Sequence, residues 1–275
     1  MEGRSCDSAL SDTVNTIEKS ISQGEYCLGV FLDIQGAFDN LQYDSISREM
    51  KERGAHLEQV EWYDHLLRNR ELEVSIKGAK CKKQPTQGTP QGGVLSTDAW
   101  NITFQPLLDL FIKGPVKANG FADDTLLLLC GKDLKTLISI MQKAIDKAIN
   151  WGNQEKLAFN PKKTAAIIFT RNHKLKINTL PKLKMSGVEL EYVNSTRYLG
   201  VIIDSKLSWT EHINTKIIEC KKILFSLRSA IGSKWGLTPE RCWWVWETMV
   251  RPKLSYGSIV WAQAAQSKTN TMKLE

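Results

Sequence analysis

The chain has 275 residues, of which 42% are hydrophobic and 24% charged, and its net charge is +7. This composition excludes a disordered, collagen-like or mucin-like chain, and the length allows one large domain or two smaller ones. The six cysteines are far apart and form no CxxC pair. Neither a zinc site nor a disulfide framework is therefore indicated, and a reducing compartment is favoured.

The apolar runs are far shorter than the roughly 18 residues that a membrane-spanning helix needs, so no membrane partner is expected. The first residues, MEGRSCDSALSD, contain acids early and lack the apolar core of a secretory signal peptide. We expect a protein of the cytosol or the nucleus that is not secreted.

Charge and tryptophan are unevenly distributed. Residues 1–130 hold 13 Lys and Arg against 19 Asp and Glu, a balance of −6, whereas residues 131–275 hold 24 against 11, a balance of +13. This asymmetry favours cation binding at one end and polyanion binding at the other, although solvated Lys-rich helices would give the same counts. Six of the nine tryptophans lie in the last 70 residues, within the basic part: Trp209, Trp235, Trp243, Trp244, Trp246 and Trp261. They would suit base stacking, but WWVW at helical spacing is more typical of core packing.

The first third of the chain mixes helices and strands. Apolar spacing predicts a helix over 8–22 with Ser11 or Asp7 as its N-cap. The segment 26–33, YCLGVFLD, is typical of a buried strand that ends in a carboxylate. Two helices and a hairpin follow, at 44–53, at 57–69, and at 72–77 with 81–85, the hairpin strands being joined by Gly78-Ala79-Lys80.

The middle third centres on a glycine-rich loop and an acidic pair. The loop at 87–93 leads into a helix at 96–111, for which Ser96 or Thr97 is the expected cap. Two strands, 116–122 and 125–130, flank Asp123-Asp124. The clearest helix, at 133–151, starts with an Asp cap and is expected to end at Gly152.

The last third becomes helical. Strands are predicted at 165–170 and 197–203, with a loop-rich stretch between them. A helix at 209–231 is followed by a second helical region, which Thr238-Pro239-Glu240 opens and which runs to Tyr256. The pattern predicts an α+β body that carries an α-helical appendage.

Three acids occupy positions where acids are costly. Asp33 closes an apolar strand, and Asp123 and Asp124 interrupt two others. Adjacent like charges between buried strands repel unless a cation neutralises them. If Asp33 and Asp123 converge on neighbouring strands, they could hold two Mg²⁺ ions for phosphoryl or nucleotidyl transfer. Each piece alone is equally typical of an ordinary turn.

Five short motifs follow one another along the chain: FLDIQGAFD at 31–39, TPQGGVLS at 89–96, FADD at 121–124, LAFNPKKT at 157–164 and YLGV at 198–201. In order and spacing they resemble the successive motifs of reverse transcriptases, most closely those of non-LTR (LINE-type) retrotransposons of the jockey- and I-like sort. The resemblance covers roughly residues 3 to 262. It implies a right-hand polymerase palm, an antiparallel sheet with helices on one face. It also implies a residual fingers segment at 1–24, a palm at 25–205 and a helical thumb-like region at 206–275.

The resemblance also implies roles for single residues. Asp33, Asp123 and Asp124 would be catalytic and would bind Mg²⁺, with Mn²⁺ as an alternative. Lys163, or its neighbour Lys162, would act on the leaving pyrophosphate. Nucleotide-binding residues would be Ile34, Phe38, Gln91 and Gly92, with the Phe38 ring excluding a 2′-hydroxyl, and primer-binding residues would be Tyr198, Leu199 and Gly200.

The implied activity is RNA-directed DNA polymerisation, in which a dNTP is added to the 3′-hydroxyl of a DNA primer on an RNA template. The alternative is a catalytically silent fragment that binds nucleic acid, because most of the family's fingers are expected to be missing. An RNA-templated RNA polymerase is disfavoured by Phe38. The chain departs from the usual pattern at 97–100, TDAW, where Asp98 would bring a new acid to the nucleotide site. The sequence leaves the oligomeric state open.

Overall fold

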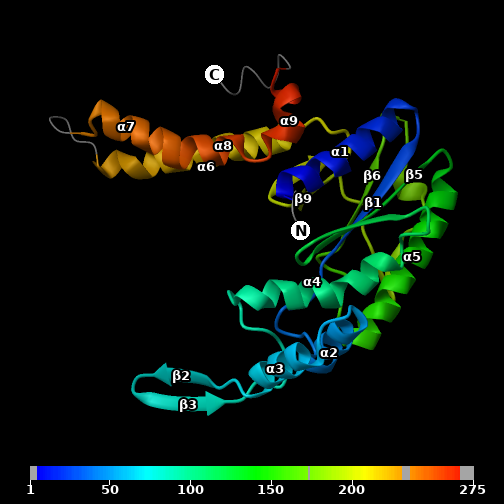
Figure 1. Cartoon of the computed structure of the whole chain (residues 1–275). Coiled ribbons are helices and arrows are strands. Elements are labelled where there is room, and N and C mark those ends of the chain that lie inside the picture. The colour runs from blue at the N-terminus through cyan, green and yellow to red at the C-terminus, as the bar shows by residue number, and fades with distance from the viewer. Residues whose placement is uncertain (1–4, 173, 231–235, 267–275) are drawn as a thin grey trace.

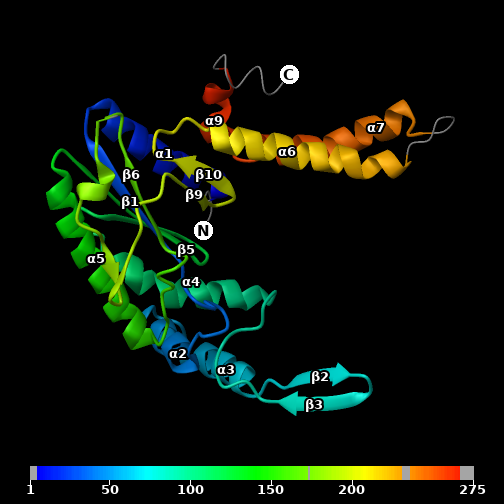
Figure 2. The same ribbon diagram turned by 180° about the vertical axis from the view of Figure 1, so that it is seen from behind.

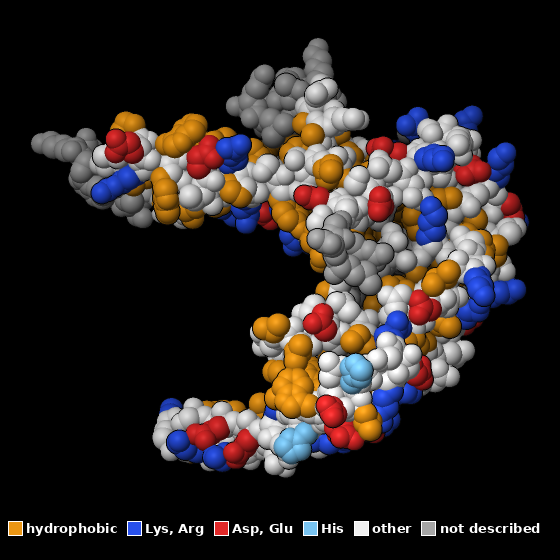
Figure 3. Space-filling view, viewed as in Figure 1, with side chains coloured by type: hydrophobic (Ala, Val, Ile, Leu, Met, Phe, Trp, Pro, Cys, Tyr) orange, Lys and Arg blue, Asp and Glu red, His pale blue; other side chains and the backbone are white. Residues whose placement is uncertain are grey.

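The computed structural model describes residues 5–172, 174–230 and 236–266, and it has the outline of a C (Figure 1). A central sheet and its covering helices form the back of the C. One arm consists of α2, α3 and the β2–β3 hairpin, and the other arm consists of α6, α7 and α8. Figure 3 shows a broad hollow between the two arms.

The central sheet has four strands in the order β4-β5-β1-β6, and every neighbouring pair is antiparallel. Its strands are β1 (Tyr26–Leu32), β4 (Lys117–Phe121), β5 (Asp124–Gly131) and β6 (Ala165–Phe169). β1 lies inside the sheet and is almost entirely buried, which explains its continuous apolar sequence. The predicted α+β architecture with an antiparallel sheet is confirmed.

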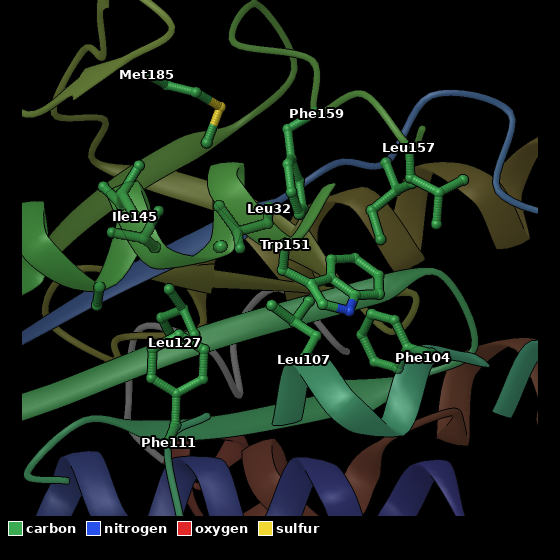
Figure 4. Packing of buried hydrophobic residues seen from close by; sticks show 14 of the residues in the cluster. Leu32, Phe104, Leu107, Phe111, Leu127, Ile145, Trp151, Leu157, Phe159 and Met185 are labelled. Carbon is green, nitrogen blue, oxygen red and sulfur yellow. The ribbon is translucent and has the colours of Figure 1, made fainter. Parts of the chain in front are cut away.

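One face of the sheet packs against α5 (Leu134–Glu155) and α4 (Val94–Asp109), in a core that also includes residues of α2 (Tyr43–Glu52). Figure 4 shows Trp151 of α5 between Phe104 and Phe159, with ring centroids 6.1 and 6.5 Å away. α5 does not end at Gly152, as its sequence suggested, but continues to Glu155. The glycine leaves room for the chain to fold back, because an added Cβ would lie 2.5 Å from the Leu157 carbonyl oxygen.

The other face packs against α1 (Cys6–Ser22), α9 (Ser258–Ala265) and a hairpin of β9 (Ser195–Tyr198) and β10 (Val201–Asp204) (Figure 2). Leu199 and Gly200 form the hairpin turn, with φ of 45° and 77°. The prediction of one strand over 197–203 is therefore wrong, because the turn divides that segment into two strands. Two successive residues with positive φ suit the twist of a tight hairpin.

Two helix caps differ from the predictions. α1 begins two residues earlier than expected, where Ser5 and Ser8 form a reciprocal capping box in place of Ser11 or Asp7. α4 begins at Val94 with Gly93 as its N-cap and not Ser96 or Thr97, and the Ser96 hydroxyl donates to the Pro90 carbonyl at 2.7 Å. The expected Asp133 cap of α5 is confirmed by its bond from the Thr136 N–H.

The lower arm in Figure 1 contains the helices α2 and α3 (Leu57–Arg68) and a projecting hairpin of β2 (Leu72–Ile76) and β3 (Ala79–Lys83). The hairpin turn consists of Lys77 and Gly78, with φ of 49° and 88°, and not of the three residues 78–80. Every residue of both strands is exposed.

The upper arm pairs α6 (Thr210–Ser226) with α7 (Pro239–Val245), a π-helical turn η3 (Trp246–Val250) and α8 (Arg251–Ser255). A short 3-10 turn, η2 (Leu227–Ala230), ends α6. The tryptophans divide: Trp209 and Trp261 are buried near the sheet, whereas Trp243 and Trp244 are 64% and 62% exposed. Core packing is therefore the wrong interpretation for these two, and Trp235 lies outside the described residues.

Short elements in the loop-rich stretch were not predicted, and they are η1 (Ile177–Thr179), β7 (Lys184–Met185) and β8 (Val188–Glu189). All six cysteines are free. Among the residues that the structure describes, no helix is both long enough and apolar enough to cross a membrane.

Candidate active site

Strand register brings the three predicted aspartates together. The last recorded pair between β1 and β5 is Leu32 with Thr125, and the residues that follow in register are Asp33 and Asp124. Asp123 occupies the tight β4–β5 turn, where Ala122 has a φ of 52°. In Figure 1 this end of the sheet faces the opening between the arms.

The electrostatics of Asp124 reflect this convergence. Partial desolvation raises the pKa of the Asp124 carboxyl above its ordinary value, and the negative charges of Asp123 and Asp33 raise it further. Like charges disfavour the ionised form of each neighbour, so a cation bound among these carboxylates would be stabilising.

The loop at 157–164 holds the end of β1 on its other side. The Asp33 N–H donates to the hydroxyl of buried Thr164, at 3.3 Å, and the Asp33 carbonyl accepts from the Asn160 N–H, at 2.8 Å. The backbone of Asp33 is therefore bonded on both sides, and neither bond uses its carboxylate. Lys163 is exposed and directly precedes Thr164, which places it on the loop that contacts Asp33.

Trp100 supports the turn that carries Asp123. Its side chain is fully buried in α4, and its indole Nε1–H donates to the Ala122 carbonyl at 2.6 Å. Its ring also contacts Phe104 and Phe38, at centroid distances of 5.2 and 5.6 Å. Sequence reasoning noted Trp100 only as a departure from the family pattern; the signal that could have identified it is a buried donor on the helix after the glycine-rich loop.

A cavity of about 570 Å³ lies between the loop after β1 and the start of α4, and its lining residue Phe38 contacts Trp100, whose indole bonds the Ala122 carbonyl. Its lining includes Phe38, Gln91 and Gly92, three of the predicted nucleotide-binding residues. Gly92 has a φ of +84° and faces open space, so a ligand can approach its backbone. The Gln91 amide donates to the Asp39 carboxylate at 3.1 Å, which connects the two loops.

The glycine-rich loop is held in place by backbone contacts. The N–H groups of Gly88 and Thr89 donate to the carbonyls of Leu41 and Phe38, at 2.7 and 2.9 Å. A Cβ on Gly88 would lie 2.6 Å from the Asp39 carbonyl oxygen, so only glycine fits.

A second anchor comes from Arg70, whose guanidinium donates to the Gly88 carbonyl at 2.6 Å and to the Tyr43 hydroxyl at 2.9 Å. The Tyr43 hydroxyl lies 3.1 Å from the carbonyls of both Pro85 and Gln87. No motif marked Arg70 or Tyr43 in the sequence.

Two residues lie differently from what was expected. The Ile34 side chain is buried in the core, so only its backbone is available to a nucleotide. Asp98 does not line the Phe38 cavity. It lines a separate apolar cavity with Trp62 and Tyr63 of α3, because it projects from another side of α4. The new acid that the sequence places near the nucleotide site is therefore absent from the lining of the cavity that contains Phe38.

The predicted primer-binding residues form the β9–β10 turn. The side chains of Tyr198 and Leu199 are buried, and burial raises the pKa of the Tyr198 hydroxyl to about 12, with the nearby Asp124 carboxylate contributing to the rise. The Leu199 carbonyl accepts from the Tyr256 hydroxyl at 3.0 Å. A Cβ on Gly200 would lie 2.8 Å from the Tyr256 ring, so the turn packs tightly against the upper arm.

The donor set suits a divalent cation that also binds substrate. Within residues 5–172, 174–230 and 236–266, no three His, Cys, Asp or Glu side chains are grouped closely enough to hold a metal unaided. Mg²⁺ commonly uses one or two carboxylates and takes its other ligands from water and phosphate. Three neighbouring aspartates, one with a raised pKa, fit that mode of binding.

Comparison with known proteins agrees with this geometry. The family model described as reverse transcriptase (RNA-dependent DNA polymerase) matches residues 2–203. A putative 115 kDa protein of the retrotransposable element R1DM from Drosophila melanogaster is 24% identical over 96% of this chain and 25% of its own length. The RNA-directed DNA polymerase of the mobile element jockey, from the same fly, is 26% identical over 96% of this chain and 29% of its own length.

The chain thus spans less than a third of the length of these two relatives. Among solved structures, apo telomerase from Candida tropicalis is 12% identical and superposes with a TM-score of 0.51, over 97% of this chain and 47% of that chain. The same telomerase truncated from its C-terminal domain is 14% identical, with a TM-score of 0.50 over 72% of this chain and 38% of that chain. At such identities the likeness concerns the fold, which is that of a polymerase palm.

Proposed function

The chain belongs to the reverse transcriptase family, and we propose that it catalyses RNA-directed DNA polymerisation at the site formed by Asp33, Asp123 and Asp124. One observation carries the proposal. Strand register brings the three carboxylates together, and Trp100 connects them to the cavity that Phe38, Gln91 and Gly92 line, because it bonds the Ala122 carbonyl and contacts the Phe38 ring. Relatives named RNA-directed DNA polymerases support the same reaction.

The aspartates would hold Mg²⁺, or Mn²⁺ in its place, with Asp33 and Asp123 as the main ligands and Asp124 assisting near the primer end. When bound, two such ions activate the primer 3′-hydroxyl and stabilise the leaving pyrophosphate. The backbone bonds to Asn160 and Thr164 keep Asp33 in place, and the bond from Trp100 to Ala122 keeps Asp123 in place. Lys163, or its neighbour Lys162, would neutralise the leaving pyrophosphate or donate a proton to it.

Phe38 would select the sugar. Its ring lines the cavity and rests against Trp100, so it cannot retreat into the core without displacing a fully buried indole. A deoxyribose fits against such a ring, whereas a 2′-hydroxyl would meet it. A Phe38→Val variant is therefore expected to incorporate ribonucleotides more readily than the parent protein.

The template and primer would lie in the hollow between the two arms (Figure 3). The described part of the 206–266 region contains more lysine and arginine than acids, and Trp243 and Trp244 present open ring faces there. Cations and exposed indoles together suit an RNA–DNA duplex or its single-stranded end. We assign the described residues within 25–205 to the palm, those within 206–275 to the thumb and those within 1–24 to a fingers segment.

The test is primer extension on an RNA template annealed to a DNA primer, with dNTPs and Mg²⁺ or Mn²⁺. The parent chain is compared with Asp123→Asn and with Glu61→Gln, which removes an exposed acid of α3 outside the site. We expect extension from the parent chain and from Glu61→Gln, and none from Asp123→Asn.

A folded chain that binds the duplex in a salt-dependent manner but extends no primer would contradict the proposal. Such a result would favour the alternative, a silent fragment that binds nucleic acid, since phosphate contacts weaken as salt rises whether or not chemistry occurs. Extension that Asp123→Asn leaves intact would place the chemistry elsewhere.

A further inference from the structure

Two cysteines face each other across the central sheet, at the end opposite the aspartates. Cys27 of β1 and Cys130 of β5 are directly paired in the strand register. Cα atoms of directly opposed residues in antiparallel strands lie about 4.5–5.5 Å apart. Disulfides span Cα distances of about 4.4–6.8 Å, so this pairing suits a disulfide without a change of backbone.

The two thiols differ in access. Cys27 is fully buried against α1, whereas Cys130 is partly exposed and lines a cavity of about 300 Å³. Polar and charged residues share that cavity, among them Ser20, Lys117 and Glu25. A small polar reagent can therefore reach Cys130 and cannot reach Cys27 directly.

The surroundings also favour the thiolate of Cys130. Hydrogen bonding from the Cys27 thiol lowers the pKa of Cys130, and the Ser20 hydroxyl and the Lys117 charge lower it further against the effects of burial and of Glu25. The same interaction raises the pKa of Cys27. Cys130 is therefore the more nucleophilic of the two thiols, and Cys27 stays protonated beside it.

We propose that Cys130 is a modification site that reacts with hydroperoxides and passes the oxidation to Cys27 as a disulfide between β1 and β5. The Cys130 sulfur attacks the terminal peroxide oxygen, the O–O bond breaks, and an alcohol, or water from hydrogen peroxide, leaves. Cys130 then carries a sulfenic acid. The Cys27 sulfur attacks the Cys130 sulfur, the S–O bond breaks, and the hydroxide takes the Cys27 proton to leave as water.

This reaction needs no partner chain and does not depend on the polymerase activity. The two thiols supply the two electrons that reduce the peroxide. Because Cys27 and Cys130 are already paired in register, the crosslink leaves the opposite strand ends, with Asp33 and Asp124, in their present register.

The reduced full-length chain is treated with a small excess of hydrogen peroxide, its remaining thiols are alkylated, and its peptides are analysed by mass spectrometry. We expect a crosslinked peptide that joins residues 27 and 130 and loses two hydrogen atoms. Both thiols should disappear together and earlier than the thiols of the exposed Cys81 and Cys242, which serve as internal controls. Closing a loop of about 100 residues should raise the unfolding temperature by about 10 °C.

Two variants separate the steps. In Cys27→Ala, Cys130 should accumulate as a sulfenic acid that dimedone labels, and in Cys130→Ala, Cys27 should stay reduced. Oxidation of Cys81 or Cys242 while residues 27 and 130 remain reduced would overturn the proposal. So would a disulfide from Cys130 to any other cysteine. Both of these contradicting results would be observed in the parent chain, so the test stands even if a variant folds poorly.

Discussion

Gly152 offers a test in which two effects of one methyl group have opposite signs. In an ordinary helix, Gly→Ala stabilises by about 0.5–1 kcal/mol because alanine loses less backbone entropy on folding. In α5, however, the new Cβ would lie 2.5 Å from the Leu157 carbonyl oxygen and 3.0 Å from Cε2 of Phe159. Backbone cannot move aside as a side-chain tip can, so one of the two segments must shift.

The crowded contact should dominate. Overpacking of a well-packed core costs about 1–3 kcal/mol. After subtraction of the helix-propensity gain, Gly152→Ala is expected to lower the free energy of unfolding by about 0.5–2 kcal/mol. The displaced segment continues into Asn160, which bonds the Asp33 carbonyl, so primer extension should slow as well.

Urea unfolding of the parent chain, Gly152→Ala and Asn150→Ala measures this difference. Asn150 is exposed on the same helix, and its replacement changes helix propensity without crowding, so it should stabilise by about 0.5 kcal/mol. If Gly152→Ala stabilised as much as Asn150→Ala does, the close approach of the 157–159 segment to α5 would be refuted.

Three further predictions concern the site and the upper arm. Asp124→Asn should raise the free energy of unfolding at neutral pH and slow primer extension. Because the folded-state pKa of Asp124 is raised, the charged carboxylate destabilises the parent chain at neutral pH, and the gain from Asn should vanish below the ordinary Asp pKa. A gain that persists in urea unfolding at acid pH would contradict this. Trp100→Phe keeps a ring but removes the donor to the Ala122 carbonyl, so it should cost about 1–3 kcal/mol in urea unfolding; unchanged stability would show that the bond contributes nothing. Replacement of both Trp243 and Trp244 by alanine should raise the Kd for primer–template about tenfold, as measured by fluorescence anisotropy. Because both rings are exposed, the free energy of unfolding should change by no more than about 0.5 kcal/mol. A large loss of stability would mean that the rings pack in a core.

The elements of the sheet and most helices were predictable because their apolar periodicity is strong. β1, whose residues are nearly all buried, has a continuous apolar run, and α5 has buried residues at regular helical spacing. The errors occur where local chemistry is overridden by a tertiary contact. Gly152 reads as a helix end, yet it marks the place where the following chain crosses the helix. Ser96 reads as a cap, yet its hydroxyl bonds the Pro90 carbonyl.

The candidate site was predictable in its carboxylates but not in its supports. The acids interrupt apolar strands, which is visible in sequence, and the order of motifs assigned them a role. The residues that hold them in place lie far away in the chain: Trp100 bonds Ala122, Thr164 bonds Asp33, and Arg70 bonds Gly88. Such pairings depend on how the elements pack, and neither spacing nor propensity encodes them.

The arrangement of these supports has a common logic. Opposed like charges in a sheet are destabilising, so Asp33 and Asp124 weaken the end of the sheet where they meet. The compensating bonds are made to backbone groups: Asn160 bonds the Asp33 carbonyl, and Trp100 bonds the carbonyl that precedes Asp123. Had these donors bonded the carboxylates, they would have satisfied the negative charge that a cation needs. The repulsion therefore remains among the acids, where the metal ion of the proposed function would relieve it.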